Sequence, residues 1–168
     1  MPKLIIDRQI VDNTATLLRS AEDGAFAAVP AQGTVIVPLA QYLAQKTELN
    51  ARGDVGVWFA PDDEPELLGA DAAALSLIAV EFPAFTDGRG FSIGRLLRER
   101  YGFTGELRAF GDVFKDTLNY LTRCGFNAFV IREDKDIGEA LKGLDDFTES
   151  YQSSVAQPMP LFRRRHAS

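Results

Sequence analysis

The sequence predicts an α/β protein with a mainly parallel sheet of about four βα units. Short runs of β-branched, aromatic and other apolar residues recur from residue 55 onward, as expected of buried strands. Amphipathic segments with the period of a helix separate these runs. Parallel strands need such crossovers, so this alternation indicates a parallel sheet with right-handed connections.

The whole chain, residues 1–168, is expected to form a single α/β domain. Its 168 residues are 46% hydrophobic, which is sufficient for one buried core. We expect residues 1–50 to be a short mixed N-terminal appendage, residues 55–151 the βα core and residues 152–168 a basic C-terminal tail.

The elements follow from local patterns along the chain. In the appendage, the apolar runs Leu4–Ile6 and Val35–Pro38 predict short strands, and apolar spacing predicts a short helix over residues 39–49. In the core, strands are expected at residues 55–59, 77–82, 106–110 and 126–131. Helical segments are expected at residues 71–76, 92–101, 112–124 and from residue 136 to about residue 151.

Capping residues support three of these helices. Asp112 and Asp136 stand where side-chain oxygens accept hydrogen bonds from the first turn of a helix. Gly102 and Gly125 stand just beyond two predicted helix ends, where glycine is the usual residue.

The loop after residue 82 is the main candidate for a ligand site. It follows a buried strand, and ligands of open α/β sheets bind at the carboxyl ends of strands. Gly88, Gly90 and Gly94 permit backbone shapes that other residues resist. Their spacing misses the dinucleotide-binding fingerprint, so a loop whose glycines only set its shape is favoured over a nucleotide site.

Arginines near this loop support two interpretations. Arg89, Arg95 and Arg108 can converge on a small anion at the helix N-terminus, where backbone N–H groups point outward. Alternatively, Asp87 pairs with Arg89 or Arg95 and staples the loop. The candidate residues for either role are Asp87, Gly88, Arg89, Gly90, Ser92, Arg95, Arg108 and Asp112.

The helix predicted over residues 92–101 contains two further arginines for which we expect no part in ligand binding. We expect Arg98 and Arg100 to lie on the solvent side of the helix or to pair with Glu99 and other nearby acids.

Two other positions have a chemical and a structural interpretation. Asp112 and Asp116 are four residues apart, so on one helix face they can share a proton or hold Mg²⁺ through waters. A helix cap is the favoured role for Asp112. Cys124 lies at a helix C-terminus, which disfavours a reactive thiolate, and is interpreted as a structural residue.

The composition excludes several classes of function. One cysteine and one histidine cannot build a protein-held zinc site or a four-cysteine iron–sulfur cluster, so no metal is expected. A net charge of −6 argues against nucleic-acid binding. No apolar run is long enough to span a membrane, and a free thiol without an export signal favours the cytoplasm.

The C-terminal tail combines an apolar pair, Leu161 and Phe162, with three arginines, Arg163, Arg164 and Arg165. Such tails are usually solvated. The alternative is docking onto an acidic protein partner, with Phe162 as the apolar anchor and the arginines as the charged contact.

Several segments together resemble domain-of-unknown-function family 934, a bacterial family. They are Phe82–Ser92, Leu96–Arg98, Gly105–Ala109, Gly111–Val113, Arg123–Phe129 and Pro160–Arg165. Members carry an oxidoreductase label linked to sulfite reduction, because their genes tend to neighbour those of assimilatory sulfite or nitrite reductase. This sequence has Lys115-Asp116-Thr117 where the family usually has Asp-Gln after Asp112.

The resemblance implies a role in sulfur assimilation, and the residues limit that role. A six-electron sulfite reductase needs a haem-type centre and a cysteine-ligated cluster, which one cysteine cannot hold. We therefore expect an accessory protein of sulfite or sulfate reduction, with sulfite reductase or another sulfur-assimilation enzyme as its partner. One alternative is a small oxidoreductase or anion-substrate enzyme with an organic cofactor that the sequence does not identify. Another is a structural homo-oligomer.

Overall fold

The fold is built on one eight-stranded sheet in the order β2-β1-β8-β7-β6-β5-β4-β3. The structure, a computed structural model, describes residues 3–84 and 86–146. The strands are β1 (Lys3–Ile6), β2 (Gln9–Asp12), β3 (Thr16–Leu17), β4 (Val35–Pro38), β5 (Val55–Phe59), β6 (Leu77–Phe82), β7 (Glu106–Gly111) and β8 (Ala128–Phe129). The helices are α1 (Leu39–Ala44), α2 (Lys46–Arg52), α3 (Arg89–Glu99), α4 (Lys115–Arg123) and α5 (Ile137–Asp146), and two 3₁₀ segments are η1 (Pro65–Leu67) and η2 (Gly69–Ala74).

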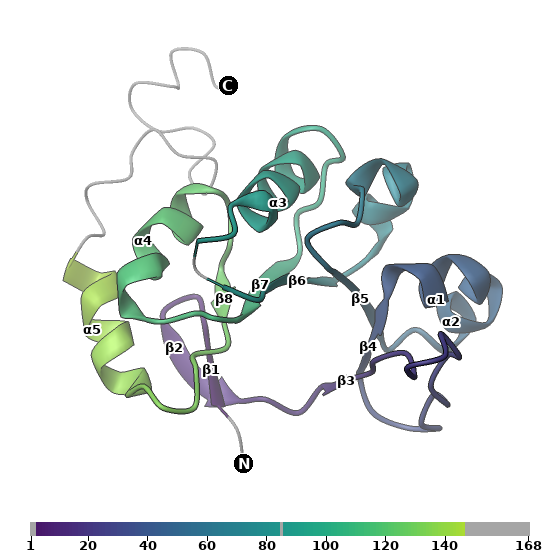
Figure 1. Ribbon diagram of the computed structural model, residues 1–168, viewed down its shortest axis with the longest axis horizontal. Helices are drawn as coiled ribbons and strands as arrows, with labels where there is room; N and C mark the ends of the chain where they lie inside the picture. Colours follow the sequence, from purple (N-terminus) through teal and green to yellow (C-terminus); the bar gives the residue numbers. More distant parts are fainter. Residues whose placement is uncertain (1–2, 85, 147–168) are drawn as a thin grey trace.

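The strands from β3 to β8 are parallel and follow one another in chain order across the sheet. Each crossover therefore steps in the same direction, and the right-handed rule places every crossover on the same face. Helices accordingly cover one face of the sheet (Figure 1). The predicted α/β fold with a mainly parallel sheet is confirmed.

Residues 3–38 contribute the strands β1 to β4 to this sheet. β1 and β2 form an antiparallel hairpin at one edge, where β1 pairs with β8. β3 and β4 extend the parallel strands at the other edge. β2 and β3, which the sequence did not predict, are therefore the two outer strands of the sheet.

Side chains of the strands alternate between two unequal faces. On the helix-covered face, Leu107 and Ala109 of β7 are fully buried in the main core, together with Ile93 and Leu97 of α3. On the opposite face, a smaller cluster contains Trp58 and three other buried residues of the strands. Within residues 3–84 and 86–146, the parallel sheet thus has a thick core on one side only, whereas such sheets generally carry helices on both faces.

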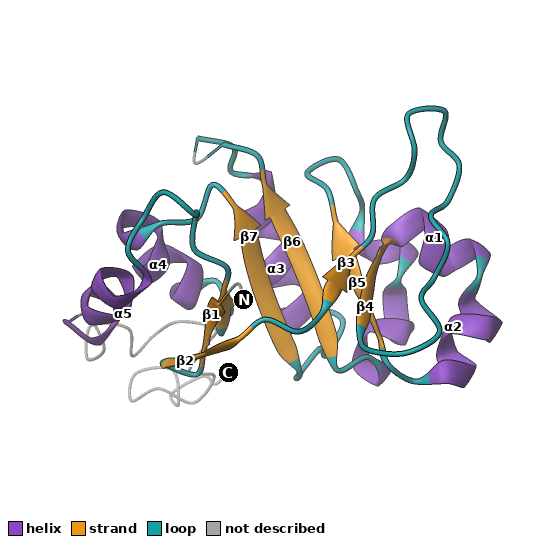
Figure 2. Ribbon diagram, turned by 90° about the horizontal axis from the view of Figure 1, so that it is seen from below, coloured by secondary structure: helices purple, strands orange, loops and turns teal. Residues whose placement is uncertain are grey.

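A segment of the N-terminal region covers part of the second face. Residues 13–19, which we call the strap, run from β2 at one edge into β3 at the other and cross in front of the strands (Figure 2). Ala15 and Leu17 of the strap pack on the Trp58 cluster. The indole Nε1 of Trp58 donates a hydrogen bond of 2.8 Å to the carbonyl oxygen of Leu18.

Helix boundaries differ from the prediction at several places. The helical segment expected over residues 71–76 is the 3₁₀ segment η2, which begins at Gly69 and ends at Ala74. The helix expected over residues 39–49 is divided at Gln45 into α1 and α2. α3 begins at Arg89 and not at residue 92. α4 begins at Lys115, so Asp112 is not its cap; instead the Thr117 hydroxyl bonds to the N–H and carbonyl of Phe114.

The strand expected over residues 126–131 is limited to β8 (Ala128–Phe129), whereas the cap predicted at Asp136 is present. Oδ1 of Asp136 accepts a 2.8 Å hydrogen bond from the N–H of Gly138 at the start of α5, as expected of a cap. The predicted end of this helix near residue 151 lies outside the described residues. No helix in residues 3–84 or 86–146 is both long and apolar enough to span a bilayer.

Candidate functional site

Charged side chains gather where the central parallel strands end. β5 is followed by Asp62 and Asp63, and β6 is followed by Asp87 and Arg89. These two loops lie beside each other because β5 and β6 are paired in register. This carboxyl edge of the sheet is the position at which α/β proteins bind ligands.

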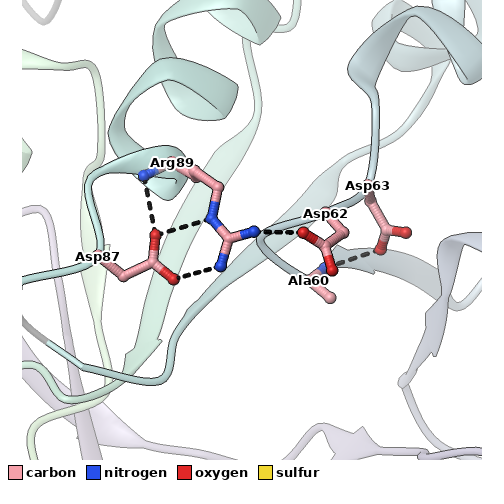
Figure 3. Close-up of polar contacts among 5 residues, drawn as sticks. All are labelled: Ala60, Asp62, Asp63, Asp87 and Arg89. Atoms are coloured by element: carbon pink, nitrogen blue, oxygen red, sulfur yellow. Dashed lines mark hydrogen bonds and ion pairs between the residues drawn. The ribbon is translucent and has the colours of Figure 1, made fainter.

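Arg89 joins the two loops (Figure 3). Its Nε and Nη2 atoms donate to Oδ1 and Oδ2 of Asp87 at 3.0 and 2.8 Å, in a two-point ion pair. Its Nη1 atom donates to Oδ1 of Asp62 in the neighbouring loop. The backbone N–H of Arg89 also donates to Asp87 Oδ1, at 3.1 Å. The side chain of Arg89 thus connects the two loops, and its backbone N–H fixes the start of α3 to Asp87.

The electrostatics of this network are dominated by the same ion pair. Hydrogen bonds from the Arg89 side chain, and then from its backbone N–H, lower the pKa of the Asp87 carboxyl below its ordinary value. The hydrogen bond to Asp87 in turn raises the pKa of Arg89. Asp87 and Arg89 are therefore both charged at neutral pH. The positive charge of Arg89 is already paired with the carboxylates of Asp87 and Asp62.

Asp63 has a different role in the neighbouring loop. Its Oδ2 accepts a hydrogen bond of 2.8 Å from the backbone N–H of Ala60, which closes the turn after β5 (Figure 3). Asp63 therefore stabilises the turn. The Asp62 side chain, in contrast, is 88% exposed to solvent although it pairs with Arg89.

The three arginines expected to converge on an anion do not meet. Arg95 pairs with Glu99 one turn along α3, at 3.4 Å, and lies 3.8 Å from Sγ of Cys124. Arg108 alternates with Leu107 and Ala109 in β7, so it projects from the opposite face of the sheet. There it bonds to Glu106 at 2.7 Å and to Asn13 at 3.1 Å.

Asp112 belongs to a second ionic cluster at the same edge. Its Oδ1 accepts a 2.7 Å hydrogen bond from Nη1 of Arg132, which follows β8. Arg132 also binds Asp134 through two hydrogen bonds, at 3.0 and 2.9 Å. Because α4 begins after Asp112, this residue and Asp116 do not share a helix face, and the paired-carboxylate arrangement is not formed.

The glycines near the loop serve close packing and not unusual backbone angles. Gly88, Gly90 and Gly94 are absent from the described glycines that have positive φ. A Cβ atom on Gly90 would lie 2.6 Å from the ring of Phe82, and one on Gly94 would lie 2.4 Å from the ring of Phe126. The expectation that these glycines shape a loop is corrected: Gly90 and Gly94 let α3 lie close to aromatic side chains.

The remaining candidates lie apart from the Arg89 network. Ser92 is exposed on α3. Cys124 is buried, and desolvation raises the pKa of its thiol, although the Arg95 charge acts in the opposite direction. The proposed docking residues of the tail, Phe162 to Arg165, lie outside the described residues.

Arg98 is a residue whose role the sequence did not indicate. It was expected on the solvent side, yet it donates to the carbonyl oxygens of Gly125, Phe103 and Gly105 at 2.9, 3.0 and 2.9 Å. Desolvation lowers the pKa of its guanidinium to about 10. Arg98 thus ties α3 to the chain segments that precede β7 and β8.

Sequence reasoning also missed Asp62 and Arg132, although a signal for both was present. Each follows the end of a parallel strand by a few residues, and such ends meet along one edge. In the described part of the chain, no group of three or more histidine, cysteine, aspartate or glutamate side chains is arranged to hold a metal ion.

Comparison with known proteins gives one match. The sequence profile of a bacterial protein family of unknown function, DUF934, matches residues 56–162, which is nearly two thirds of the chain. The matched region includes the Asp62, Asp87 and Arg89 network and the Asp112 and Arg132 cluster. No curated protein and no solved structure matches the chain significantly.

Proposed function

The chain belongs to the bacterial protein family of unknown function DUF934, and on that premise we propose that it is an accessory protein of assimilatory sulfite or sulfate reduction. It would act by binding an enzyme of that process, with sulfite reductase as the first candidate partner. The sulfur assignment is supported by the label that the resembling proteins carry. The accessory assignment is supported by the residues.

The observation that carries the accessory role is the Arg89 network. At the edge where a substrate anion would bind, all three nitrogens of the Arg89 guanidinium donate to carboxylates of Asp87 and Asp62. A substrate anion bound here would compete with these two carboxylates for the guanidinium and would be repelled by their negative charge. The single cysteine is buried with a raised pKa, so it supplies no reactive thiolate. This favours protein binding over catalysis.

The partner is tested by capture from cells. The tagged protein is recovered from bacteria grown with sulfate as the only sulfur source, and co-purifying proteins are identified by mass spectrometry. We expect a sulfur-assimilation enzyme to be enriched. Replacing Arg163, Arg164 and Arg165 together by Ala should reduce its recovery at least tenfold if the basic tail makes the contact.

A matched control removes three cations from the described part of the chain. Lys3→Ala, Arg100→Ala and Lys142→Ala lower the net charge by the same amount but leave the tail intact, so recovery should equal that of the wild type. If the wild-type protein recovers no sulfur-assimilation enzyme, the accessory role in this process is wrong. If the two triple variants lose the partner equally, the tail is not the contact.

A small-anion site at Arg89 is the second part of the proposal. The Arg89 side chain is 56% exposed, and Asp62 is the more exposed of its two partners, so an anion would take the place of Asp62. Asp62→Ala should therefore tighten sulfate or sulfite binding several-fold, and Arg89→Gln should abolish it. Calorimetric titration with each anion, against chloride at equal ionic strength, measures this. Equal affinity in the wild type and Arg89→Gln contradicts the site.

A further inference from the structure

A pocket of about 390 Å³ lies at the amino edge of the sheet, on the face opposite the helices. Its walls come from the starts of β5, β6 and β7 and from the strap, which supplies Thr14 and Ala15. This volume lies within the usual range for small-molecule sites. The pocket is at the opposite ends of the strands from the Arg89 network and shares no residue with it.

Arg108 provides an unusual group in this pocket. Its side chain is only 7% exposed, and it lines the pocket. Nε donates to Glu106 and Nη1 donates to Asn13, whereas Nη2 has no hydrogen-bond partner among residues 3–84 and 86–146. A buried guanidinium normally uses most of its five N–H donors. The Nη2 group is therefore available to an acceptor that enters the pocket.

The same pocket is also lined by an exposed carboxylate, Asp54, whose charge is opposite to that of Arg108. Asp54, directly before β5, is exposed and makes no ion pair with any described residue, whereas Asp12 at the rim is already paired with Lys3 at 2.6 Å. Asp54 can therefore accept hydrogen bonds from a cationic group. Among the charged side chains that line the pocket, the buried Arg108 thus offers a cationic donor and the exposed Asp54 offers a carboxylate that has no ion-pair partner among the described residues.

The sheet register gives the distance that a ligand must cover. Arg108 is level with Ala79 of β6, which is level with Trp58 of β5, so Asp54 lies two strands away and four residues lower. These steps correspond to roughly 10 Å across the sheet and roughly 13 Å along it, before the side chains reach toward each other. The charges of the ligand must therefore be separated by several carbon atoms.

We propose that this pocket binds an extended zwitterion, a small molecule with a carboxylate at one end and an amine at the other. The carboxylate accepts from Nη2 of Arg108, and the amine is held by Asp54. Glu106 keeps its bond to Arg108, so the guanidinium lies between two carboxylates, as Arg89 does at the other edge. The proposal concerns binding, and it does not depend on the sulfur assignment.

The test compares four small probes by calorimetric titration of the full-length protein. We use 6-aminohexanoate as the extended zwitterion, hexanoate and hexylamine as compounds that lack one charge each, and glycine as a zwitterion that is too short. We expect 6-aminohexanoate to bind at least tenfold more tightly than the other three. Equal or absent binding of all four probes would overturn the proposal.

Variants then place the ligand. Asp54→Asn changes one exposed side chain and should weaken 6-aminohexanoate binding at least tenfold, toward the affinity for hexanoate. Glu106→Gln with Arg108→Gln removes both buried charges together, so neither is left uncompensated, and should have a similar effect. Asp62→Asn at the opposite edge is the control and should bind as the wild type does. If the double variant does not fold, the Asp54→Asn result decides, and unchanged affinity there overturns the proposal.

Discussion

Arg98 illustrates how a charged residue can hold a fold together from a half-buried position. Burial disfavours its charged form, which is why the pKa of the guanidinium is lowered to about 10. Three carbonyl oxygens compensate for the lost water, and the guanidinium also lies 5.2 Å from the centre of the Phe103 ring. The carbonyls belong to the chain segments before β7 and β8, outside regular secondary structure, so Arg98 supplies hydrogen bonds that a helix or sheet would otherwise provide.

Replacing Arg98 should therefore lower stability more than replacing the exposed Arg100, which directly follows α3. We expect Arg98→Met to lower the free energy of unfolding by about 2–4 kcal/mol, because three carbonyls lose a charged donor. Arg98→Lys should cost less but remain destabilising, since an ammonium group cannot span all three acceptors. Urea denaturation followed by circular dichroism measures both variants.

Arg100 supplies the matched control, because it is exposed directly after the end of α3 and its side chain makes no hydrogen bond or ion pair with any described residue. Arg100→Met should change the unfolding free energy by no more than about 0.5 kcal/mol. Equal effects of the Arg98 and Arg100 substitutions would contradict the bridging role.

At the scale of elements, the sequence predicts the strands of the core better than the helix starts. The buried runs Val55–Phe59 and Leu77–Phe82 are apolar on both faces except at Glu81, as is typical of strands in a parallel sheet, and they were placed correctly. The start of α3 was misplaced because glycines normally indicate a loop. Here Gly90 is helical because the Phe82 ring occupies the space that a side chain would need.

A pattern for this packing was nevertheless present in the sequence. Gly90 and Gly94 are four residues apart, so in a helix they lie on one face and permit close approach. By contrast, β2 and β3 could not be predicted from their residues. β3 has two residues and β2 is mostly exposed, so neither has the apolar pattern of a buried strand, and both depend on pairing with distant segments.

In the candidate site, contacts between residues close in the sequence could be predicted, whereas contacts that depend on strand pairing could not. The pairing of Asp87 with Arg89 is local, and it was one of the two interpretations that the sequence left open. The third partner, Asp62, comes from another loop, and only the register of β5 and β6 brings it close. The position of Arg108 depends on strand alternation, which places it on the face away from α3.

The described part of the molecule has a thick core on one face of the sheet and a thin layer on the other. Helices cover one face of the sheet, whereas the opposite face relies on the strap and on a small cluster around Trp58. Besides the short pairing of β3 with β4, the strap is held by a few side-chain contacts: Asn13 with Arg108, Leu18 with Trp58, and Arg19 with Glu81 at 2.8 Å. The thin face should therefore open at lower free energy than the main core, because few buried contacts oppose local unfolding.

Trp58, the only tryptophan of the chain, can report on this opening. The guanidinium of Arg19 lies 4.9 Å from the centre of the Trp58 ring system and also pairs with Glu81. Arg19→Ala removes both contacts, so we expect a red-shifted Trp58 emission and stronger quenching by acrylamide. Because Arg19 is largely exposed, the global unfolding free energy should fall by less than about 1 kcal/mol. Lys3→Ala, which breaks an exposed ion pair with Asp12 outside the strap, should leave the emission unchanged. If acrylamide quenches Trp58 equally in Arg19→Ala, Lys3→Ala and the wild type, the strap does not open locally and the prediction is wrong.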